Sequence, residues 1–415
     1  MPSATPLPRG PSHLALFGAE DLLHGPGCPV CRYVDEAADR FRAWFALEAH
    51  AEPSMITRLC RSLGLCPAHT RALLVQPGAD RRLTAVYRYV LRAAARYLAD
   101  GTSPPAGCLG CARDAEALTR AVDTLLTGLA DDDVRERYHA TDGLCLPHLR
   151  VAVARCGRRL TAWLAGQAAA SLATGRADLP AIAGDHDADA RIRVRLRAVL
   201  PAAMPPAAAL PAGICPVCLT AALAERDLLA GAAPAAGHAE PDVTHASFCA
   251  VHLRDACSTG SQAAAERIVA AESVRAAAWL AGLASAPRLR SALRNPAGRR
   301  RGPAAARCPA CEAAGAAETL QLMAIARSAG GHARPPGLCL RHVIALRRRD
   351  PRSAEAALME AGRTTQTVLH ELEQALDKRT WARRHEPQGR EMTAWRRAAA
   401  LIDGRVYGGG PPGPL

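Results

Sequence analysis

The feature that most constrains this chain is a cysteine–histidine pattern that occurs four times. Each copy, here called a cassette, has a Cys-x-x-Cys pair followed by a Cys-x-x-His pair after 34, 33, 30 or 27 intervening residues. Twelve of the fifteen cysteines belong to these cassettes. The four sets are Cys28, Cys31, Cys66 and His69; Cys108, Cys111, Cys145 and His148; Cys215, Cys218, Cys249 and His252; and Cys308, Cys311, Cys339 and His342.

Three thiols and one imidazole form one of the usual ligand sets of a closed structural zinc site. Two residues three positions apart lie on one face of a helix, so each pair can bind an ion from the first turn of a helix. Pro29, Pro216 and Pro309 follow the first cysteine of their pairs, and proline suits the first helical position. The sequence therefore predicts up to four zinc ions, each held by the two ligand pairs of one cassette.

Other cysteine chemistry fits the pattern less well. Cys-Pro-x-Cys at a helix start also resembles a disulfide-exchange motif, but the strand–helix–strand context of that motif is missing. An iron–sulfur cluster normally takes four thiolates, and haem attachment needs a histidine directly after the second cysteine. A thiol redox or zinc-release sensor nevertheless stays open as an alternative function.

The remaining cysteines and histidines show no second site. Cys60, Cys156 and Cys257 do not recur at one cassette position, and we interpret them as core residues. The histidines near ligand pairs are interpreted as surface or capping residues; they are His24, His139, His245 and His332. The chain has no His-Glu-x-x-His motif and no Gly-rich phosphate loop, and a closed Cys3His site has no open position for substrate. These observations favour a binding module over an enzyme.

Apolar residues recur at helical spacing throughout the chain, and no alternating strand pattern is present. Each cassette is expected to contain a helix, a short helix, a helix and a long helix. The sequence Arg81 to Ala85 (RRLTA) recurs at Arg158 to Ala162, which indicates an internal repeat. The prediction is an all-α protein of tandem helical cassettes, each stapled by a Cys3His zinc site.

An Ala- and Pro-rich stretch, residues 179–211, is the predicted linker between two helical units. The units are residues 21–178, with the first two cassettes, and residues 212–405, with the last two and a closing helix. Residues 1–20 are expected to be a flexible N-terminus and residues 406–415 a disordered tail. Aromatic residues make up only 4% of the chain, so structural metal would compensate for a thin core.

The net charge of +13 raises the question of nucleic-acid binding. Most arginines are scattered among acidic residues along the expected helices. No aromatic residues accompany the basic runs, which argues against a stacking platform for single strands. The two runs are Arg294, Arg299, Arg300, Arg301 and Arg307, and Arg347, Arg348, Arg349 and Arg352. We interpret them as a solvated linker or helix face; nucleic-acid binding stays an alternative beside an unknown protein partner.

The N-terminal residues do not resemble a signal peptide, and charged residues interrupt every Ala-rich run before it reaches the length of a membrane helix. The expected location is therefore the cytoplasm, without membrane contact. In that reducing compartment, cysteines at this spacing are better interpreted as metal ligands than as disulfides.

The chain also resembles a family of bacterial proteins of unknown function that carry paired Cys-x-x-Cys and Gly-[Leu/Phe]-Cys-x-x-His cassettes. The matching residues are Cys28 to Cys31, Arg135 to His148, and a closing segment with Glu386-Pro387, Gly389 and Trp395 to Ala398. Family members look like one two-cassette unit that ends in this closing helix. The resemblance therefore implies two such units in tandem, with their metal sites, but no activity.

Two departures from the family pattern carry expectations of their own. Cassette three has Ala246-Ser247-Phe248 before its ligand cysteine where the other cassettes have Gly-Leu, which predicts a looser third site. The first unit has no closing segment before the linker, so it is expected to lean on the second unit.

Overall fold

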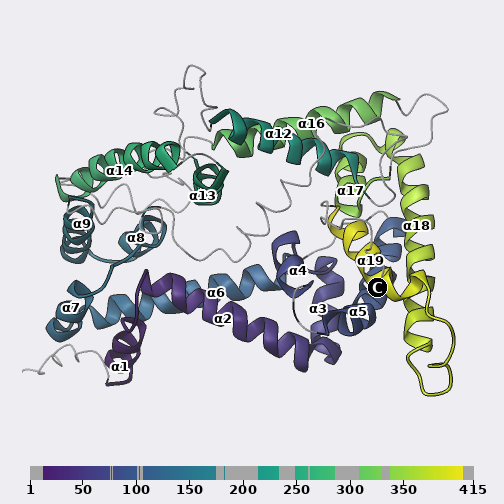
Figure 1. Cartoon of the computed structure of the whole chain (residues 1–415), viewed down its shortest axis with the longest axis horizontal. Helices are drawn as coiled ribbons and strands as arrows, with labels where there is room; N and C mark the ends of the chain where they lie inside the picture. The colour runs from purple at the N-terminus through teal and green to yellow at the C-terminus, as the bar shows by residue number, and fades with distance from the viewer. Residues whose placement is uncertain are drawn as a thin grey trace, which may run out of the picture. The chain divides into compact units, whose positions relative to one another are not determined.

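The computed structural model describes residues 13–74, 76, 78–100, 102, 106–173, 182, 214–232, 248–259, 262–285, 308–328 and 337–404. Within these ranges the regular structure is helical and contains no strand (Figure 1). The all-helical prediction is confirmed. The predicted linker, apart from Ile182, and the predicted tail lie outside the described residues.

In the first two cassettes the helices follow the predicted plan; in the last two, the predicted short helix lies outside the described residues. In the first half they are α1 (His13–Leu22), α2 (Pro29–Leu47), α3 (Pro53–Ser62), α4 (Pro67–Leu74), α5 (Ala79–Asp100), α6 (Leu109–Gly128), α7 (Asp132–His139), α8 (Leu146–Val153) and α9 (Arg158–Ala173), with a 3-10 turn η1 (Ala49–Ala51). In the second half they are α12 (Pro216–Ala232), α13 (Ala250–Thr259), α14 (Gln262–Ser285), α16 (Pro309–Ser328), α17 (Leu340–Arg349), α18 (Pro351–Asp377) and α19 (Ala394–Asp403), with a 3-10 turn η4 (Arg390–Thr393).

The internal repeat seen in the sequence has a structural counterpart. Its two RRLTA copies lie in the first turns of α5 and α9, and the threonine of each copy is buried, Thr84 at 0% and Thr161 at 3% exposure. Gly64 and Gly143 have φ of 86° and 74°, directly before the Leu-Cys of each ligand pair. This left-handed turn is readily adopted by glycine, which has no Cβ. The two copies therefore occupy corresponding positions in the first two cassettes, and that these cassettes are repeats of one unit stays a prediction.

The chain divides into two compact units, and each draws on both halves of the sequence. Unit 1 comprises Met1–Ala38, Asp114–Ala190 and Leu229–Pro309; unit 2 comprises Asp39–Arg113, Arg191–Leu228 and Ala310–Leu415. These units do not follow the predicted boundaries. That residues 21–178 and 212–405 fold as separate domains stays a prediction.

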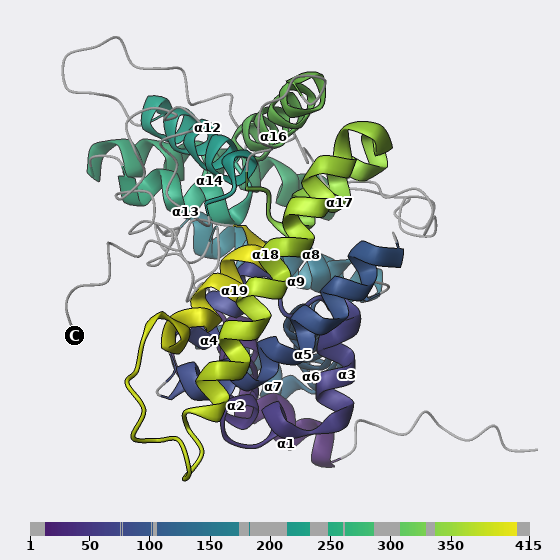
Figure 2. The same cartoon turned by 90° about the vertical axis from the view of Figure 1, so that its right-hand side faces the viewer.

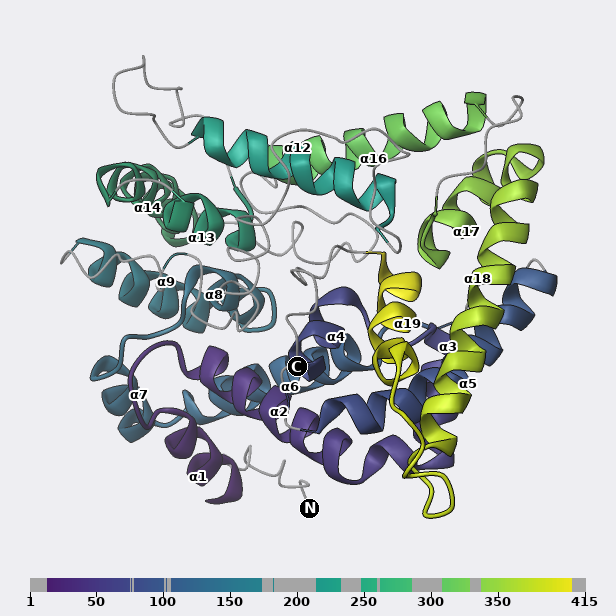
Figure 3. The same cartoon turned by 45° about the vertical axis from the view of Figure 1, so that its right-hand side comes forward.

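In unit 1, α14 packs against α9, and α8 and α13 lie beside their neighbours α9 and α14 (Figure 3). In unit 2, α18 is the central element and contacts α5, α17 and α19 (Figure 2). The hydrophobic core of unit 2 joins Phe45 of α2, Leu91 of α5 and Leu372 of α18 in one buried cluster. Helices from the two ends of the sequence therefore share a single core.

The first helix begins at His13, inside the segment predicted to be flexible. Its conspicuous apolar residues, Leu14 and Phe17, are exposed; Ala19 and Leu22 are buried instead. A Cβ added to Gly128 at the end of α6 would lie only 2.2 Å from the Cβ of Ala19, so the two helices cross in close contact. Small residues allow this approach, and sequence hydrophobicity alone does not reveal it.

Candidate metal centres

All eight ligand pairs lie at helix starts, as predicted. The helices that begin directly after the first ligand of a pair are α2, α4, α6, α8, α12, α13, α16 and α17. The carbonyl of the first cysteine accepts the first helical hydrogen bond, for example from Leu149 N to Cys145 O at 2.8 Å. The second ligand is consequently the third residue of the helix and lies on the same face as the first.

The sixteen residues come together in four groups, but with different partners from those predicted. Two groups combine the first pair and the last pair of a half-chain, and we call them outer clusters. Two combine the second and third pairs, and we call them inner clusters. Outer cluster 1 is Cys28, Cys31, Cys145 and His148; inner cluster 1 is Cys66, His69, Cys108 and Cys111; outer cluster 2 is Cys215, Cys218, Cys339 and His342; inner cluster 2 is Cys249, His252, Cys308 and Cys311.

The prediction of one site within each cassette is therefore wrong, and helix length gives the reason. An α-helix advances by the same rise for every residue, so its length is proportional to its residue count. Helix α2 carries the chain away from Cys28 and Cys31, and it is about twice as long as α3. The shorter α3 can therefore bring the chain only part of the way back. Cys66 and His69 consequently meet the next Cys-x-x-Cys pair rather than their own. Cassette three likewise forms no separate loose site, because its ligands belong to two different clusters.

The geometry of the outer clusters fits a tetrahedral zinc ion. Zinc–sulfur bonds of about 2.3 Å and zinc–nitrogen bonds of about 2.0 Å place two sulfurs about 3.8 Å apart and a sulfur and nitrogen about 3.5 Å apart. Cys31 Sγ lies 3.7 Å from Cys145 Sγ, and His148 Nδ1 lies 3.5, 3.3 and 3.2 Å from the sulfurs of Cys28, Cys31 and Cys145. A single ion between these four atoms would satisfy them all.

Outer cluster 2 repeats this arrangement. Its His342 Nδ1 lies 3.4, 3.3 and 3.2 Å from the sulfurs of Cys215, Cys218 and Cys339. Cys218 Sγ lies 4.0 Å from Cys339 Sγ. The two outer clusters thus have the same ligand order and the same histidine nitrogen directed at the sulfurs.

The inner clusters use the same histidine nitrogen, and in inner cluster 1 the arrangement is looser. His69 Nδ1 lies 3.1 Å from Cys66 Sγ but 3.7 Å from the sulfurs of Cys108 and Cys111. In inner cluster 2, His252 Nδ1 lies 3.2 Å from the sulfurs of both Cys249 and Cys308. Four Cys/His clusters can therefore hold metal ions, each through three sulfurs and one Nδ1 atom.

The thiols of one cluster differ in pKa. Hydrogen bonds from Cys218 and Cys339 hold the pKa of Cys215 well below its usual value. Burial opposes ionisation of Cys28, but hydrogen bonds from Cys145, Cys31 and His148 outweigh it and also lower the pKa of this thiol. In inner cluster 1, a hydrogen bond from Cys66 lowers the pKa of Cys108. In these three clusters the lowered pKa belongs to the first cysteine of the Cys-x-x-Cys pair, and metal binding would release the remaining thiol protons.

The outer and inner clusters differ most in exposure. Every ligand of the outer clusters is buried, with exposed fractions from 0% to 9%. Inner cluster 1 has three half-buried ligands, and its Cys111 is exposed. Inner cluster 2 likewise ends in an exposed cysteine, Cys311. Each half of the sequence therefore contributes one enclosed cluster and one that reaches the surface.

Inner cluster 1 depends on a glycine between its two cysteines. A Cβ at Gly110 would lie 2.2 Å from Cδ2 of His69, so the imidazole ring rests directly on the backbone of this turn. The other Cys-x-x-Cys pairs have Val30, Val217 and Ala310 at this position. This glycine is the sequence signal that distinguishes inner cluster 1, and the spacing of the ligands alone does not reveal it.

The closing segment covers outer cluster 2. Gly404 ends α19 with φ of 63°, and a Cβ there would lie 2.2 Å from the sulfur of Cys339 and 3.0 Å from that of Cys218. The predicted closing helix is α-helical only from Ala394, and Trp381 ahead of it is exposed. Pro387 and Gly389 precede the helical turns and account for the later start.

Ion pairs anchor this closing segment to α18. Lys378 Nζ donates to Glu391 Oε1 at 2.8 Å, and the backbone N–H of Gly389 donates to the same oxygen at 2.7 Å. The hydrogen bond from Lys378 lowers the pKa of the buried Glu391 carboxyl to about 2. Glu371 of α18 pairs with both Arg390 and Arg397. The cover over outer cluster 2 is thus fastened by ion pairs whose carboxylates, Glu371 and Glu391, are buried.

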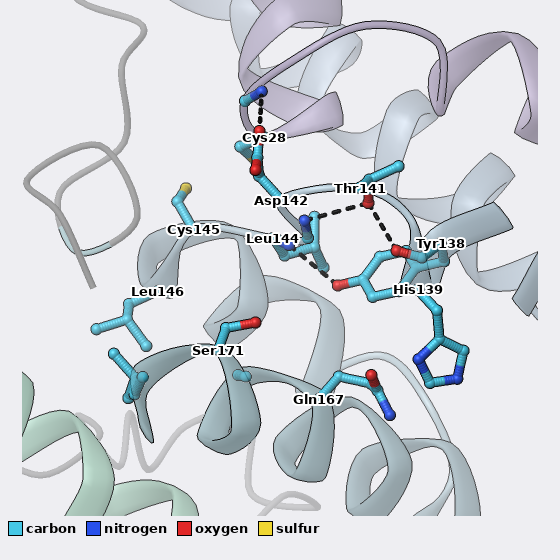
Figure 4. Close-up of a pocket in the computed structure, with 14 residues that line it drawn as sticks. Cys28, Tyr138, His139, Thr141, Asp142, Leu144, Cys145, Leu146, Gln167 and Ser171 are labelled. Atoms are coloured by element: carbon cyan, nitrogen blue, oxygen red, sulfur yellow. Dashed lines mark hydrogen bonds between the residues drawn. The ribbon is translucent and has the colours of Figure 1, made fainter. Parts of the chain in front are cut away.

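Outer cluster 1 has a pocket beside it rather than a closing helix (Figure 4). The pocket has a volume of about 130 Å³, and Cys28, Cys145, Gln167 and Ser171 are among its lining residues. Its rim is fixed by two hydrogen bonds, from Gly27 N to Asp142 Oδ2 at 2.7 Å and from Leu144 N to the Tyr138 hydroxyl at 3.0 Å.

The other candidate residues stay outside the clusters. Cys60, Cys156 and Cys257 join no cluster of the described residues, and they are half-buried rather than core residues. Burial raises the pKa of each of these thiols. His139 packs edge-on against Trp163. His245 and His332 lie outside the described residues.

The arginine runs give no defined site. Arg294 to Arg307 lie outside the described residues. In the second run, Arg348, Arg349 and Arg352 are exposed at the α17–α18 junction, with the capping carboxylate of Asp350 among them. Nucleic-acid binding stays a prediction.

Comparison with protein-family models, curated proteins and solved structures finds no match for this chain. The resemblance to bacterial proteins with paired cassettes stays a prediction, with which the tandem Cys/His clusters are consistent. Across the described ranges, no helix combines the length and the apolar character needed to cross a membrane.

Proposed function

We propose that this chain is a zinc-binding helical repeat protein in which four Cys3His sites stabilise a scaffold for protein interactions. The observation that carries the proposal is the geometry of the outer clusters, where sulfur–sulfur distances of 3.7 and 4.0 Å approach the spacing that tetrahedral zinc requires. Zinc would supply a closed, redox-inactive link between helix starts. The ligands would be the sixteen cluster residues, three thiolates and one Nδ1 atom for each ion.

The links would join segments far apart in the sequence. Outer cluster 1 would tie the start of α2 to the start of α8, and outer cluster 2 would tie α12 to α17. A structural zinc site contributes on the order of 10 kcal/mol near neutral pH, comparable with the net stability of a whole domain. In a chain with few aromatic core residues, such links can decide whether the fold forms.

The proposed role as an interaction module is supported by apolar side chains that the described fold leaves exposed. Leu14 and Phe17 lie one turn apart on α1, and Leu320 and Met323 lie one turn apart on α16. Exposed apolar side chains at this spacing are a common feature of helix-mediated contacts. We propose a cytoplasmic location, where thiols stay reduced and available to zinc.

Metal analysis of protein purified under reducing conditions tests this proposal. We expect about four zinc ions per chain and a cooperative loss of helical circular dichroism when a strong chelator removes them. Iron as the dominant metal, or a fully folded chain with no bound metal, would contradict it. Circular dichroism with and without chelator separates these outcomes.

A second candidate function is a thiol-based zinc-release sensor, and the exposure of Cys111 and Cys311 favours it. A peroxide would accept two electrons from two cysteine thiolates of an inner cluster. A disulfide would form, the peroxide oxygens would leave as water or alcohol after protonation, and the ion would be released. At low peroxide concentration, this function predicts rapid loss of two zinc ions, with disulfides confined to the inner ligands. Retention of all four ions would argue for purely structural sites.

A further inference from the structure

The surroundings of the second ring nitrogen of His342 indicate how this ligand of outer cluster 2 is oriented. Its Nδ1 atom faces the three sulfurs, and its Nε2 atom is buried without a hydrogen-bond partner in the described structure. An imidazole that binds a metal through Nδ1 carries its proton on Nε2, which is then a donor. A buried donor of this kind requires an acceptor.

Glu318 of α16 places a carboxylate close to this nitrogen. Its Oε1 atom is 3.7 Å from His342 Nε2 and 4.0 Å from a guanidinium nitrogen of Arg341. The Glu318 side chain is 31% exposed and has several rotatable bonds, so a small adjustment brings its oxygen into hydrogen-bonding distance. Arg341, the residue before the ligand histidine, would hold the carboxylate from the other side.

We propose that Glu318 is a positioning residue for the metal of outer cluster 2, which it orients by accepting the Nε2–H of His342. This inference rests on the proposed zinc function. The hydrogen bond fixes the imidazole in the tautomer that leaves Nδ1 free for the metal and makes that nitrogen more basic. Such partners of ligand histidines typically change metal affinity by roughly 10- to 100-fold.

The first half of the chain provides an internal control. Glu318 lies seven residues after Cys311, and the residue seven after Cys111 is Leu118. The position of Arg341 in the Cys-x-x-His pair is Pro147 in the corresponding pair of outer cluster 1. Neither residue type of this arrangement therefore recurs at the matching positions of the first half.

Inner cluster 2 has a related feature. Asp255 lies one helical turn after His252 on α13, is 1% exposed, and belongs to a group whose candidate ligand atoms lie within 4.8 Å of one another. A carboxylate near the ligand histidine therefore occurs twice in the second half. This recurrence supports the view that the carboxylate orients the ligand histidine and is not a chance surface contact.

The test compares zinc-loaded full-length wild-type protein with the Glu318→Gln variant. The matched control is Glu355→Gln, at an exposed position of α18 that belongs to none of the four clusters. In a chelator series, mass spectrometry of alkylated cysteines reports the metal of each cluster. We expect half-alkylation of Cys339 at a chelator concentration at least about tenfold lower in Glu318→Gln, with Cys145 unchanged. Equal protection of Cys339 in all three proteins would overturn the inference.

Spectra of ¹⁵N-labelled histidine separate positioning from a merely structural effect. In wild-type protein, zinc-bound histidines should give Nδ1-ligated, Nε2-protonated signals. Glu318→Gln should shift one Nε2–H signal and accelerate its exchange with solvent, while the others stay unchanged. If no signal moves, the inference fails although the zinc function stands. If the wild-type protein shows no zinc-bound histidine at all, the proposed function itself fails.

Discussion

The outer and inner clusters have the same ligand types, three cysteines and one histidine, at the same kind of helix start. They occupy different environments. Cys215, Cys218 and Cys339 of outer cluster 2 belong to the buried core of unit 2, in the same group of side chains as Leu372 and Trp395. Inner cluster 1 lies in the same unit, and its Cys111 is exposed. Ligand spacing therefore does not determine how a metal site is used; the helices packed around it do.

This difference teaches that two chemically equal sites can have unequal roles. An ion in an outer cluster would be enclosed by side chains, and its release would require the core to open. An ion in an inner cluster would be within reach of chelators and oxidants through an exposed cysteine. The following predictions test that contrast, beginning with the largest expected effect.

Removing one ligand should affect the two clusters of unit 2 very differently. In Cys339→Ser, a buried site loses zinc binding worth on the order of 10 kcal/mol, which is comparable with the net stability of a whole domain. We expect loss of the cooperative thermal transition of unit 2. In Cys66→Ser, we expect one fewer zinc ion and a lowered but still cooperative transition. Differential scanning calorimetry together with metal analysis distinguishes the two variants. Equal losses of thermal stability in both would contradict the contrast between the clusters.

Chelator should empty the clusters in a defined order. We expect the cysteines of the inner clusters to be alkylated at least about tenfold faster than Cys31 and Cys145, because the outer ligands become accessible only through local opening. Peptide mass spectrometry over a time course measures each rate. Alkylation of all twelve ligand cysteines at one common rate would show instead that the metal sites open together.

Filling the close contact at Gly404 should damage the covered cluster. In Gly404→Ala, the new Cβ would meet the Cys339 sulfur and the residue would keep a positive φ, so we expect a destabilisation of about 2 to 4 kcal/mol. Gly362→Ala on α18 is the control, because no atom lies within 4 Å of its added Cβ. That variant should be neutral or more stable by up to about 1 kcal/mol. Urea unfolding gives both values, and equal stabilities would refute the close fit.

The smallest effect is expected from the anchor of the closing segment. The pKa of Glu391 is lowered to about 2, so its contribution is present above its ordinary value near 4.5 and is lost as pH falls from there toward 2. Glu391→Gln should therefore be less stable than wild type at pH 7, and the difference should shrink as the pH falls through this window. It should also increase alkylation of Cys218. Chemical unfolding at several pH values measures this, and a pH-independent difference would contradict the ion-pair role.

The sequence predicted the helices that start at the ligand pairs, and the position of every pair, because both depend on local properties. Proline after cysteine, apolar spacing and Gly-Leu before the second pair all act within a few residues. The eight helices that begin directly after the first ligand of each pair agree with this local prediction. The combination of pairs depends instead on how far each helix carries the chain. The number of residues between two ligand pairs does not give the distance between them in space. A long helix such as α2 and a short one such as α3 lie between the pairs of one cassette, and the connections after them are of similar size.

Other features were not visible in a single sequence. Gly404 lies more than sixty positions after Cys339, and only the folded chain brings its backbone against that sulfur. Glu318 lies on a helix whose own cysteines belong to a different cluster from His342. The units of the fold also combine segments from both halves of the chain. Each of these features depends on tertiary packing between distant segments.

The nested pairing of ligands also sets an order for biosynthesis. On the ribosome, all four ligands of inner cluster 1 would be available once Cys111 leaves the exit tunnel, whereas Cys28 and Cys31 would have to wait for His148. Because translation adds on the order of ten residues each second, that wait lasts on the order of ten seconds. During this interval the first two thiols are exposed to competing metals and to neighbouring nascent chains. Early closure of inner cluster 1 would keep Cys66 and His69 from pairing with Cys28 and Cys31. These two cysteines would then still be free to combine with Cys145 and His148 when His148 emerges.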